Sequence, residues 1–154
     1  MPRSMENSNS RLLLSEILRK VSNAKTKQEK VSLLRKHNST ALRQLLIINF
    51  DESIISMMPE GDVPYTPNDA PLGTDHTRLE SEYRGLYRFF KGGQDKLPAL
   101  KRESMFVQLL EGLSADEAEL LVLVKDGRMN ENYKRITKAV VSEAYPNIEW
   151  GGRS

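Results

Sequence analysis

Residues 38–50, with the sequence NSTALRQLLIINF, are the best candidate for a buried helix in the chain. Asn38 and Ser39 belong to the residue types that cap helix N-termini, because their side-chain oxygens accept hydrogen bonds from free N–H groups of the first turn. Apolar residues then occupy most positions, namely Leu42, Leu45, Leu46, Ile47 and Ile48. A helix that is apolar on most sides is buried on most sides. This segment predicts the central helix of an α-helical core.

Two amphipathic helices are predicted before this segment. In residues 10–22, apolar side chains recur at spacings of three and four, as expected for one face of a helix. Thr26 and Glu29 then form a capping-box pattern, in which each side chain accepts from a backbone N–H at the start of the helix. The second helix is therefore expected over residues 26–37.

Further helices are predicted after residue 76. Thr77 with Glu80 and Ser114 with Glu117 are two more capping-box patterns, and the glycines at 92, 93 and 127 supply helix ends. Helical spacing continues through residues 99–113 and 131–145. The residues expected to face inward are Leu79, Tyr83, Leu86, Phe90, Met105, Phe106, Leu109, Leu110, Leu113, Tyr133, Ile136, Ala139, Val140 and Ala144.

These patterns predict an all-α fold, a single bundle of six to seven helices. No alternating polar and apolar run of the strand type occurs in the chain. The helical domain is expected over residues 11–146, between a flexible N-terminus at 1–10 and a tail at 147–154 that is flexible unless Trp150 packs back. The alternative arrangement is two helical subdomains, residues 10–58 and 77–146.

A long proline-rich loop separates the two helical halves. Residues 59–76 read PEGDVPYTPNDAPLGTDH and contain four prolines, a spacing that excludes a helix or a central strand. A connection of this length is unusual inside a compact domain, so it is either a linker or a functional packed loop. We call residues 59–76 the central loop.

Composition excludes several classes of protein. The chain has no cysteine, which removes disulfides, thiolate metal sites and cysteine nucleophiles and fits an intracellular setting. No apolar run approaches the roughly 20 residues that a membrane helix needs. Neither His37 nor His76 lies in a catalytic or metal-ligand pattern, and His37 is expected to be partly cationic near a helix C-terminus. The sequence thus predicts no catalytic site, no metal and no cofactor.

Charge is strongly segmented along the chain. Residues 1–50 hold ten Lys or Arg and three acids, whereas residues 51–76 hold six acids and no Lys or Arg. The basic part and Arg residues beside aromatic ones provide a candidate nucleic-acid surface, because cations neutralise phosphates and rings stack on bases. The candidate residues are Lys25, Lys27, Lys30, Arg35, Lys36, Arg84 and Arg88.

The central loop is a second candidate binding site. Its prolines stiffen the backbone, which lowers the entropy lost on docking into a partner's groove. The candidate partner-binding residues are Pro64, Tyr65, Pro67 and Asn68. In the alternative interpretation, Val63, Tyr65 and Leu72 pack against the protein's own helices while the acids of the loop face the basic first helices.

Several segments resemble an uncharacterised protein family of contractile-tailed marine bacteriophages, notably those that infect cyanobacteria. They are MPEGDVPYTPNDAPLGTDHT at 58–77, KRESMFVQLLEGL at 101–113, VKDGRMNENYKRITKAVVSEAYP at 124–146 and, near the start, AKTKQEKVSLLRKH at 24–37. The resemblance implies a phage accessory protein made in the cytoplasm of the host bacterium. It implies no activity, cofactor or catalytic residue.

Two functions follow from the residues and the resemblance together. The first is a non-enzymatic accessory protein that binds a host or phage protein, and the alternative is a nucleic-acid-binding accessory of phage replication or transcription. A structural virion component is a third class. The sequence leaves the oligomeric state and the partner open.

Overall fold

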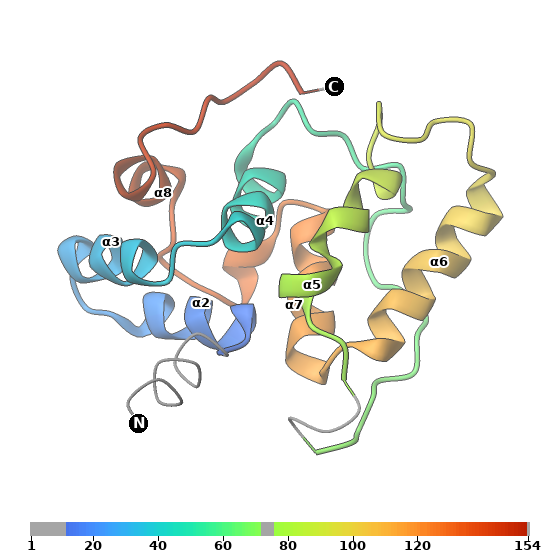
Figure 1. The fold of residues 1–154 in the computed structure, drawn as a ribbon, viewed down its shortest axis with the longest axis horizontal. Coiled ribbons are helices and arrows are strands. Elements are labelled where there is room, and N and C mark those ends of the chain that lie inside the picture. Colours follow the sequence, from blue (N-terminus) through green and yellow to red (C-terminus); the bar gives the residue numbers. More distant parts are fainter. Residues whose placement is uncertain (1–11, 72–75, 154) are drawn as a thin grey trace.

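The computed structural model describes residues 12–71 and 76–153. Within these two ranges it contains seven α-helices, two 3₁₀ helices and no β-strand, so the all-α prediction is confirmed (Figure 1). The expected flexible N-terminus at 1–10 and part of the central loop, including Leu72, lie outside the described residues. The elements are α2 (Leu14–Asn23), α3 (Lys27–Lys36), α4 (Thr40–Phe50), α5 (Leu79–Glu82), η1 (Tyr83–Phe89), α6 (Ala99–Gly112), α7 (Ala115–Lys125), η2 (Met129–Glu131) and α8 (Lys138–Ala144).

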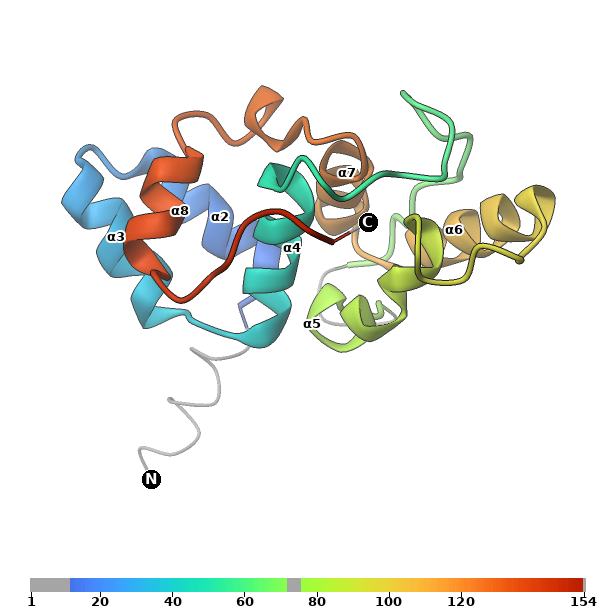
Figure 2. The ribbon, with the colours of Figure 1, turned by 90° about the horizontal axis from the view of Figure 1, so that it is seen from above.

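The helices form one bundle around a continuous core. α4 and α7 lie in the middle, with α2, α3 and α8 at one end and α6 at the other (Figures 1 and 2). α8 packs on α3 although about a hundred residues separate them, so the start and the end of the helical domain share one side of the molecule. The two-subdomain alternative is therefore wrong.

The central helix is the one expected from residues 38–50. Ser39 caps α4 by accepting a hydrogen bond from Leu42 N at 3.1 Å. Leu42, Leu45 and Leu46 are completely buried, and Ile48 is partly buried because it faces a surface cleft. The prediction from this segment is confirmed.

Several helix ends were also predicted correctly from local pattern. Thr26 and Glu29 form the expected capping box at the start of α3. α7 ends at Lys125, and Gly127 just beyond it adopts φ +69° and places the N–H groups of Gly127 and Arg128 on the carbonyls of Val124 and Leu123. Glycine adopts this left-handed conformation without steric cost, which is why it ends helices in this motif.

The capping box predicted at Thr77 is wrong. The Thr77 N–H donates to Gly112 O at 2.7 Å, in an isolated bridge between residue 77 and residue 113, and α5 begins two residues later at Leu79. The acceptor for the Leu79 N–H is Glu117 Oε1, at 3.0 Å, from a different helix. A long-range contact thus replaces the local cap.

Glu117 caps two helices at once. Its Oε2 accepts from Leu14 N, the first residue of α2, at 3.0 Å, while its Oε1 accepts from Leu79 N, the first residue of α5. The residue is completely buried. The predicted capping box at α7 is consequently only half formed, because Ser114 Oγ accepts from Glu117 N but the Glu117 carboxylate points to α2 and α5.

The last helix is shorter than predicted. Arg135 has φ +66°, which interrupts the helical run, and Thr137 then caps a short α8. Tyr133 and Ile136 are buried as expected, but from the irregular segment before α8. Ala139 is exposed, so its prediction as an inward residue is wrong.

We expect Glu117→Gln to destabilise the protein by about 2 kcal/mol, since an amide has one acceptor oxygen and leaves one of the two buried N–H groups unpaired. The free energy of unfolding measured in urea checks this. Asp116→Asn in the same helical turn is the matched control, with a cost of no more than about 1 kcal/mol because Asp116 is exposed and interacts mainly with the helix dipole. Equal costs for the two variants would contradict the double-cap role.

The same residue predicts a pH dependence. Burial raises the pKa of Glu117 above its ordinary 4.5, against the opposing effect of the hydrogen bonds from Leu79 and Leu14. The unfolded chain therefore loses this proton at lower pH than the folded protein does, and the contribution of Glu117 to stability falls as pH rises above about 4.5. The stability difference between wild type and Glu117→Gln, measured against pH, should shrink over that interval.

Candidate functional site

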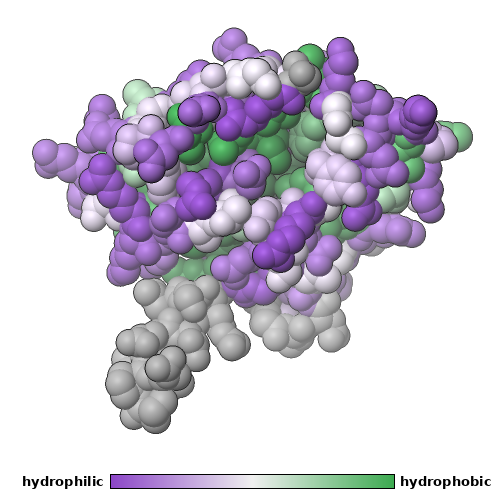
Figure 3. All heavy atoms as spheres, turned by 45° about the horizontal axis from the view of Figure 1, so that its top comes forward, coloured by the Kyte–Doolittle hydropathy of each residue, from purple (hydrophilic) through white to green (hydrophobic). Residues whose placement is uncertain are grey.

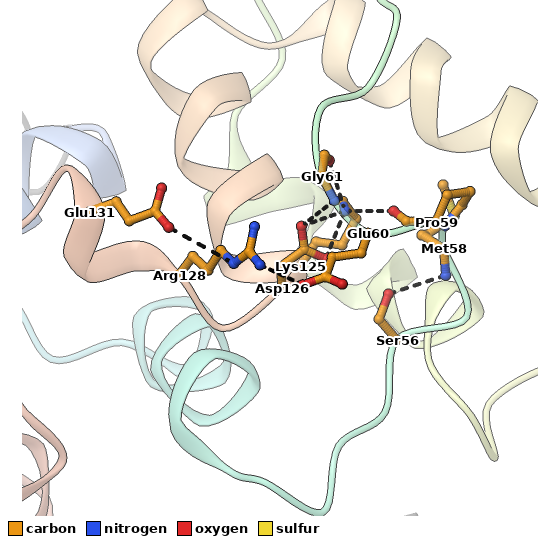
Figure 4. A network of polar contacts seen from close by, with 9 residues as sticks. All are labelled: Ser56, Met58, Pro59, Glu60, Gly61, Lys125, Asp126, Arg128 and Glu131. Carbon is orange, nitrogen blue, oxygen red and sulfur yellow. Dashed lines mark hydrogen bonds and ion pairs between the residues drawn. The ribbon is translucent and has the colours of Figure 1, made fainter.

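The described part of the central loop, residues 59–71, packs along α6 and α7. Lys125, at the end of α7, donates to the carbonyls of Pro59 at 2.9 Å and Gly61 at 3.2 Å (Figure 4). Its buried ammonium group also forms an ion pair of 2.8 Å with Asp126, which accepts from Gly61 N at 2.9 Å. These contacts, which we call the α7 latch, hold the start of the loop.

The candidate partner-binding residues of the loop divide into two groups. Tyr65 is half-buried against the core, and Asn68 donates to Glu111 O at 3.2 Å, so these two residues hold the loop on the protein itself. Pro64 and Pro67 are exposed. The interpretation in which the loop packs on its own helices therefore fits Val63 and Tyr65, both of which contact the core.

The charges of the loop are arranged differently from the expectation. Glu60 pairs with Arg128 at 2.5 Å, beyond the end of α7, rather than with the basic helices near the N-terminus (Figure 4). The backbone of the loop also contacts α6, where Glu111 Oε2 accepts from Thr66 N at 2.8 Å. Glu60 therefore does not face the first helices, contrary to the expectation for the acids of the loop.

The basic residues of α3 do not form one free patch. Lys27 forms an ion pair of 3.0 Å with Glu143, and Arg35 donates to Glu143 O at 2.9 Å, so both hold the end of α8. Lys30 is buried and donates to Ala24 O. Lys25 and Lys36 are the two exposed members of the predicted set in this region without a hydrogen bond or ion pair in the described structure. Of the five predicted residues in this region, one is therefore buried, two are exposed but paired with α8, and two are exposed without such a partner in the described residues.

Arg84 and Arg88 lie on η1, whose period differs from that of an α-helix. A 3₁₀ helix has three residues per turn, so residues three apart share a face. Leu86 and Phe89 are buried on one face, while Arg84 and Tyr87 are exposed on another, and Tyr87 has 53% of its surface accessible. The 3₁₀ geometry therefore presents an aromatic ring and a cation side by side.

Arg84 and Tyr87 border a cleft between α4 and η1. The cleft has a volume of about 480 Å³ and an apolar floor that includes Ile48, Ile54, Leu86 and Phe90. Its rim residues are Gln44, Tyr83, Arg84, Tyr87, Lys91 and Arg153. In Figure 3, which turns the top of Figure 1 towards the reader, hydrophobic residues are visible in a hollow between hydrophilic ones on this face.

The cleft is cationic. Its lining includes Arg84, Lys91 and Arg153 and no acidic residue, whereas the four other pockets found in the described residues each have at least one carboxylate in their lining. The Arg84 guanidinium lies 5.1 Å from the centre of the Tyr83 ring, within the range of a cation–π contact. Within the described residues, neither Arg84 nor Lys91 forms an ion pair.

The wall of the cleft is held by backbone contacts. Met57 N donates to Phe89 O at 2.9 Å and Lys91 N donates to Ile55 O at 2.8 Å, which joins residues 55–57 to the end of η1. At Gly93 a Cβ atom would lie 2.0 Å from Tyr87 O, so only glycine fits there. Sequence reasoning assigned Gly93 as a helix stop and missed this close approach, which no local pattern reveals.

The C-terminal segment completes one side of the cleft. Trp150 packs back, as the alternative for the tail required, with Nε1 donating to Ser142 Oγ at 3.0 Å. Asp51 accepts from Gly151 N at 2.9 Å and pairs with Arg153 at 2.5 Å, so the segment crosses α4 and brings Arg153 to the rim (Figures 1 and 2). Residues 147–153 are therefore packed on the domain rather than loose.

The pKa values of Asp51 and His37 are both lowered, for different reasons. Burial would raise the pKa of Asp51, but hydrogen bonds from Ser53, Gly151 and Arg153 outweigh it and hold the pKa well below its usual range. At His37, burial and then the charges of Lys36 and Lys20 lower the pKa below 6.5, which is the direction opposite to that expected for a partly cationic ring. In residues 12–71 and 76–153 no group of three or more His, Asp or Glu side chains is arranged to hold a metal ion.

The comparisons with known proteins place the chain in a family. A model described as a family of unknown function, DUF6433, matches residues 17–131. The chain belongs to this family. Gln44, the whole of η1, Lys91 and the α7 latch lie within the matched residues, whereas Arg153 lies beyond them. No curated protein and no solved structure matches the chain.

The membrane prediction was tested on the described helices. None of them combines the length and the apolar character that crossing a membrane requires.

The α7 latch predicts a large cost for one substitution. Lys125→Met leaves the Asp126 carboxylate and two loop carbonyls without their buried donor, and we expect a loss of about 3 kcal/mol or more in urea unfolding. Cleavage by a protease within residues 59–71 should become faster. Arg128→Ala, which removes the exposed pair with Glu60, is the control and should cost less than about 1 kcal/mol. A latch variant as stable as this control would show that the loop is held elsewhere.

The tail contact can be followed through Trp150, the single tryptophan of the chain. Asp51→Ala removes the acceptor of Gly151 and Arg153, and we expect the emission of Trp150 to shift to the red as the ring becomes solvated. In wild type the same shift should appear only in acid, because a lowered folded pKa contributes stability above about pH 3.8 that is lost as pH falls below it. An unchanged spectrum in Asp51→Ala would mean that Trp150 holds the tail alone.

Proposed function

We propose that this protein is a non-enzymatic accessory protein that binds nucleic acid through the cleft between α4 and η1. The observation that supports this proposal is the set of cations and exposed tyrosine around an acid-free cleft. Lys and Arg side chains neutralise phosphates and release the counterions that surround them, and this supplies most of the affinity of non-specific binding.

The structure supports the cleft more than the two other candidate binding sites, the basic residues of α3 and the central loop. Two basic residues of α3, Lys27 and Arg35, contact α8, and two of the four candidate residues in the central loop are occupied by the core and α6. Arg84 and Lys91 have no carboxylate partner within the described residues, so their charges are available to an anionic ligand.

The biological setting is part of the same proposal. The resemblance of the central loop and of residues 101–113 to proteins of contractile-tailed marine phages supports a phage accessory protein that works in the cytoplasm of the host bacterium. The matching family has no described function, so the proposed nucleic-acid ligand rests on the cleft.

A protein partner is the second candidate, at a different place. Pro64 and Pro67 remain exposed on a loop that the α7 latch holds in one conformation. A pocket of about 260 Å³ lies beside Pro64, with Met58, Val63 and Val107 in its lining. Because a stiff, anchored segment loses little entropy on docking, this surface suits a protein ligand. Substitutions at the cleft would leave this surface at Pro64 and Pro67 unchanged.

The proposal predicts the effect of reversing charges at the rim. Arg84→Glu combined with Lys91→Glu should weaken binding of a labelled oligonucleotide at low salt by at least about tenfold, and should reduce the slope of log affinity against log salt by about 2. Fluorescence anisotropy measures both quantities.

The matched control carries the same change of charge on α3 and its flank. Lys25→Glu combined with Lys36→Glu alters two exposed lysines outside the cleft and should leave most of the affinity in place. Equal losses in the two double variants would move the interface towards α3. Absence of binding by the wild type at low salt would overturn the proposed function.

A further inference from the structure

We infer that the cleft accepts a single unpaired nucleobase, so that the protein binds single strands in preference to duplex. This inference rests on the proposed function and adds the state of the nucleic acid and the part of it that enters the protein. It is supported by the shape of the cleft, the exposure of one ring and the position of the free cations.

The cleft has the size and lining of a site for a flat aromatic ligand. Its volume of about 480 Å³ lies within the range of small-molecule sites, and apolar side chains such as Ile48, Leu86 and Phe90 form its floor. The apolar floor gives contact to the face of a ring, and the exposed amide of Gln44 at the rim offers both a donor and an acceptor to a base edge. A phosphate or a peptide carboxylate alone would leave that floor unused.

Tyr87 supplies the stacking surface. Its side chain is more than half exposed although it adjoins the buried Phe89 and Phe90, so its ring is not needed to fill the core. The Arg88 guanidinium lies 5.6 Å from the centre of the same ring. Stacking of bases on exposed aromatic side chains beside cations is the usual way in which proteins bind single strands without sequence preference.

The cations are placed to hold the backbone of the same strand. Arg84 and Lys91 are both exposed and both line the cleft, Arg84 near the start of η1 and Lys91 two residues beyond its end, with Tyr87 between them in the sequence. Arg153 also lies at the rim, but its charge is compensated by Asp51. Arg84 and Lys91, neither of which forms an ion pair within the described residues, can each contact one of the two phosphates next to a base that stacks on Tyr87.

A base pair within a duplex does not satisfy this arrangement. Its faces are covered by the neighbouring pairs, so a base reaches a concave pocket only when it is unpaired or extruded, at a cost of a few kcal/mol. The cleft wall is in turn fixed by two backbone hydrogen bonds between residues 55–57 and the end of η1 and by the close approach of Gly93 to Tyr87. A preformed site loses little conformational entropy when an unpaired base enters it, which adds to the affinity for the single strand.

The test measures the affinity of the full-length protein for four labelled probes of equal length. They are oligo-dT, oligo-U, a DNA duplex and an RNA duplex, all at the same low salt concentration. We expect both single strands to bind at least about tenfold more tightly than the duplexes. The comparison of oligo-dT with oligo-U shows whether DNA or RNA is preferred.

Three variants separate stacking from charge. Tyr87→Leu should weaken single-strand binding by about tenfold and leave duplex binding unchanged, whereas Tyr87→Phe keeps the ring and should retain wild-type affinity. Arg84→Gln combined with Lys91→Gln should weaken binding of every probe. Tyr87 is exposed, so neither substitution at that position is expected to unfold the protein.

The outcomes distinguish the inference from the proposal on which it rests. Duplex binding as tight as single-strand binding, or no loss in Tyr87→Leu, would overturn the base site and leave the nucleic-acid function standing. No binding of any probe would overturn both, and an interaction with a protein that survives Arg84→Gln and Lys91→Gln would favour the surface at Pro64 and Pro67.

Discussion

The buried carboxylate of Glu117 is the contact on which the arrangement of the helices depends. The first N–H groups of a helix have no partner within the helix, and they are costly to bury without one. α2 and α5 both begin inside the protein, and each leaves its first residue facing the same side chain on α7. One carboxylate therefore fixes the starts of two helices from opposite halves of the chain against a third. The raised pKa of Glu117 reflects the desolvation that this position imposes.

The fold could be predicted from the sequence wherever the deciding interaction is local. The caps at Thr26 and Ser39 and the stop at Gly127 each depend on residues within a few positions, and they form as expected. The class of fold and the buried face of α4 follow from the same local patterns. The start of α5 could not be predicted, because its acceptor lies on α7 and only the tertiary fold brings the two together. The extent of the last helical run was also predicted wrongly, because no local pattern indicates the left-handed conformation of Arg135, which lies between the buried Tyr133 and Ile136.

The candidate sites were less predictable, because the availability of a charge depends on its neighbours in space. Lys27, Lys30 and Arg35 are indistinguishable in sequence from solvent-exposed lysines and arginines, yet each has a partner, on α8 or in the preceding turn. Among the acids of the central loop, Glu60 pairs with Arg128 rather than with a basic residue of α3. Arg84 and Arg88 were identified correctly as beside aromatic residues. The grouping of Arg84 with Gln44 and Lys91 in one cleft depends on the three-residue period of η1 and on the position of α4, which no helical pattern in the sequence indicates.

The packing of the protein does not by itself explain why the cleft is open and positively charged. An apolar floor left open to water loses the free energy that a covering side chain would gain, and like charges such as Arg84 and Lys91, which form no ion pair within the described residues, repel one another. The protein has the means to avoid both, since Asp51 neutralises Arg153 at the same rim and the tail already crosses α4. Backbone hydrogen bonds and a glycine with no room for a Cβ instead keep the wall of the cleft rigid. A site that is held open and positively charged gains its stabilisation when an anionic ligand with an apolar face binds, and an unpaired nucleotide combines those two properties in one group.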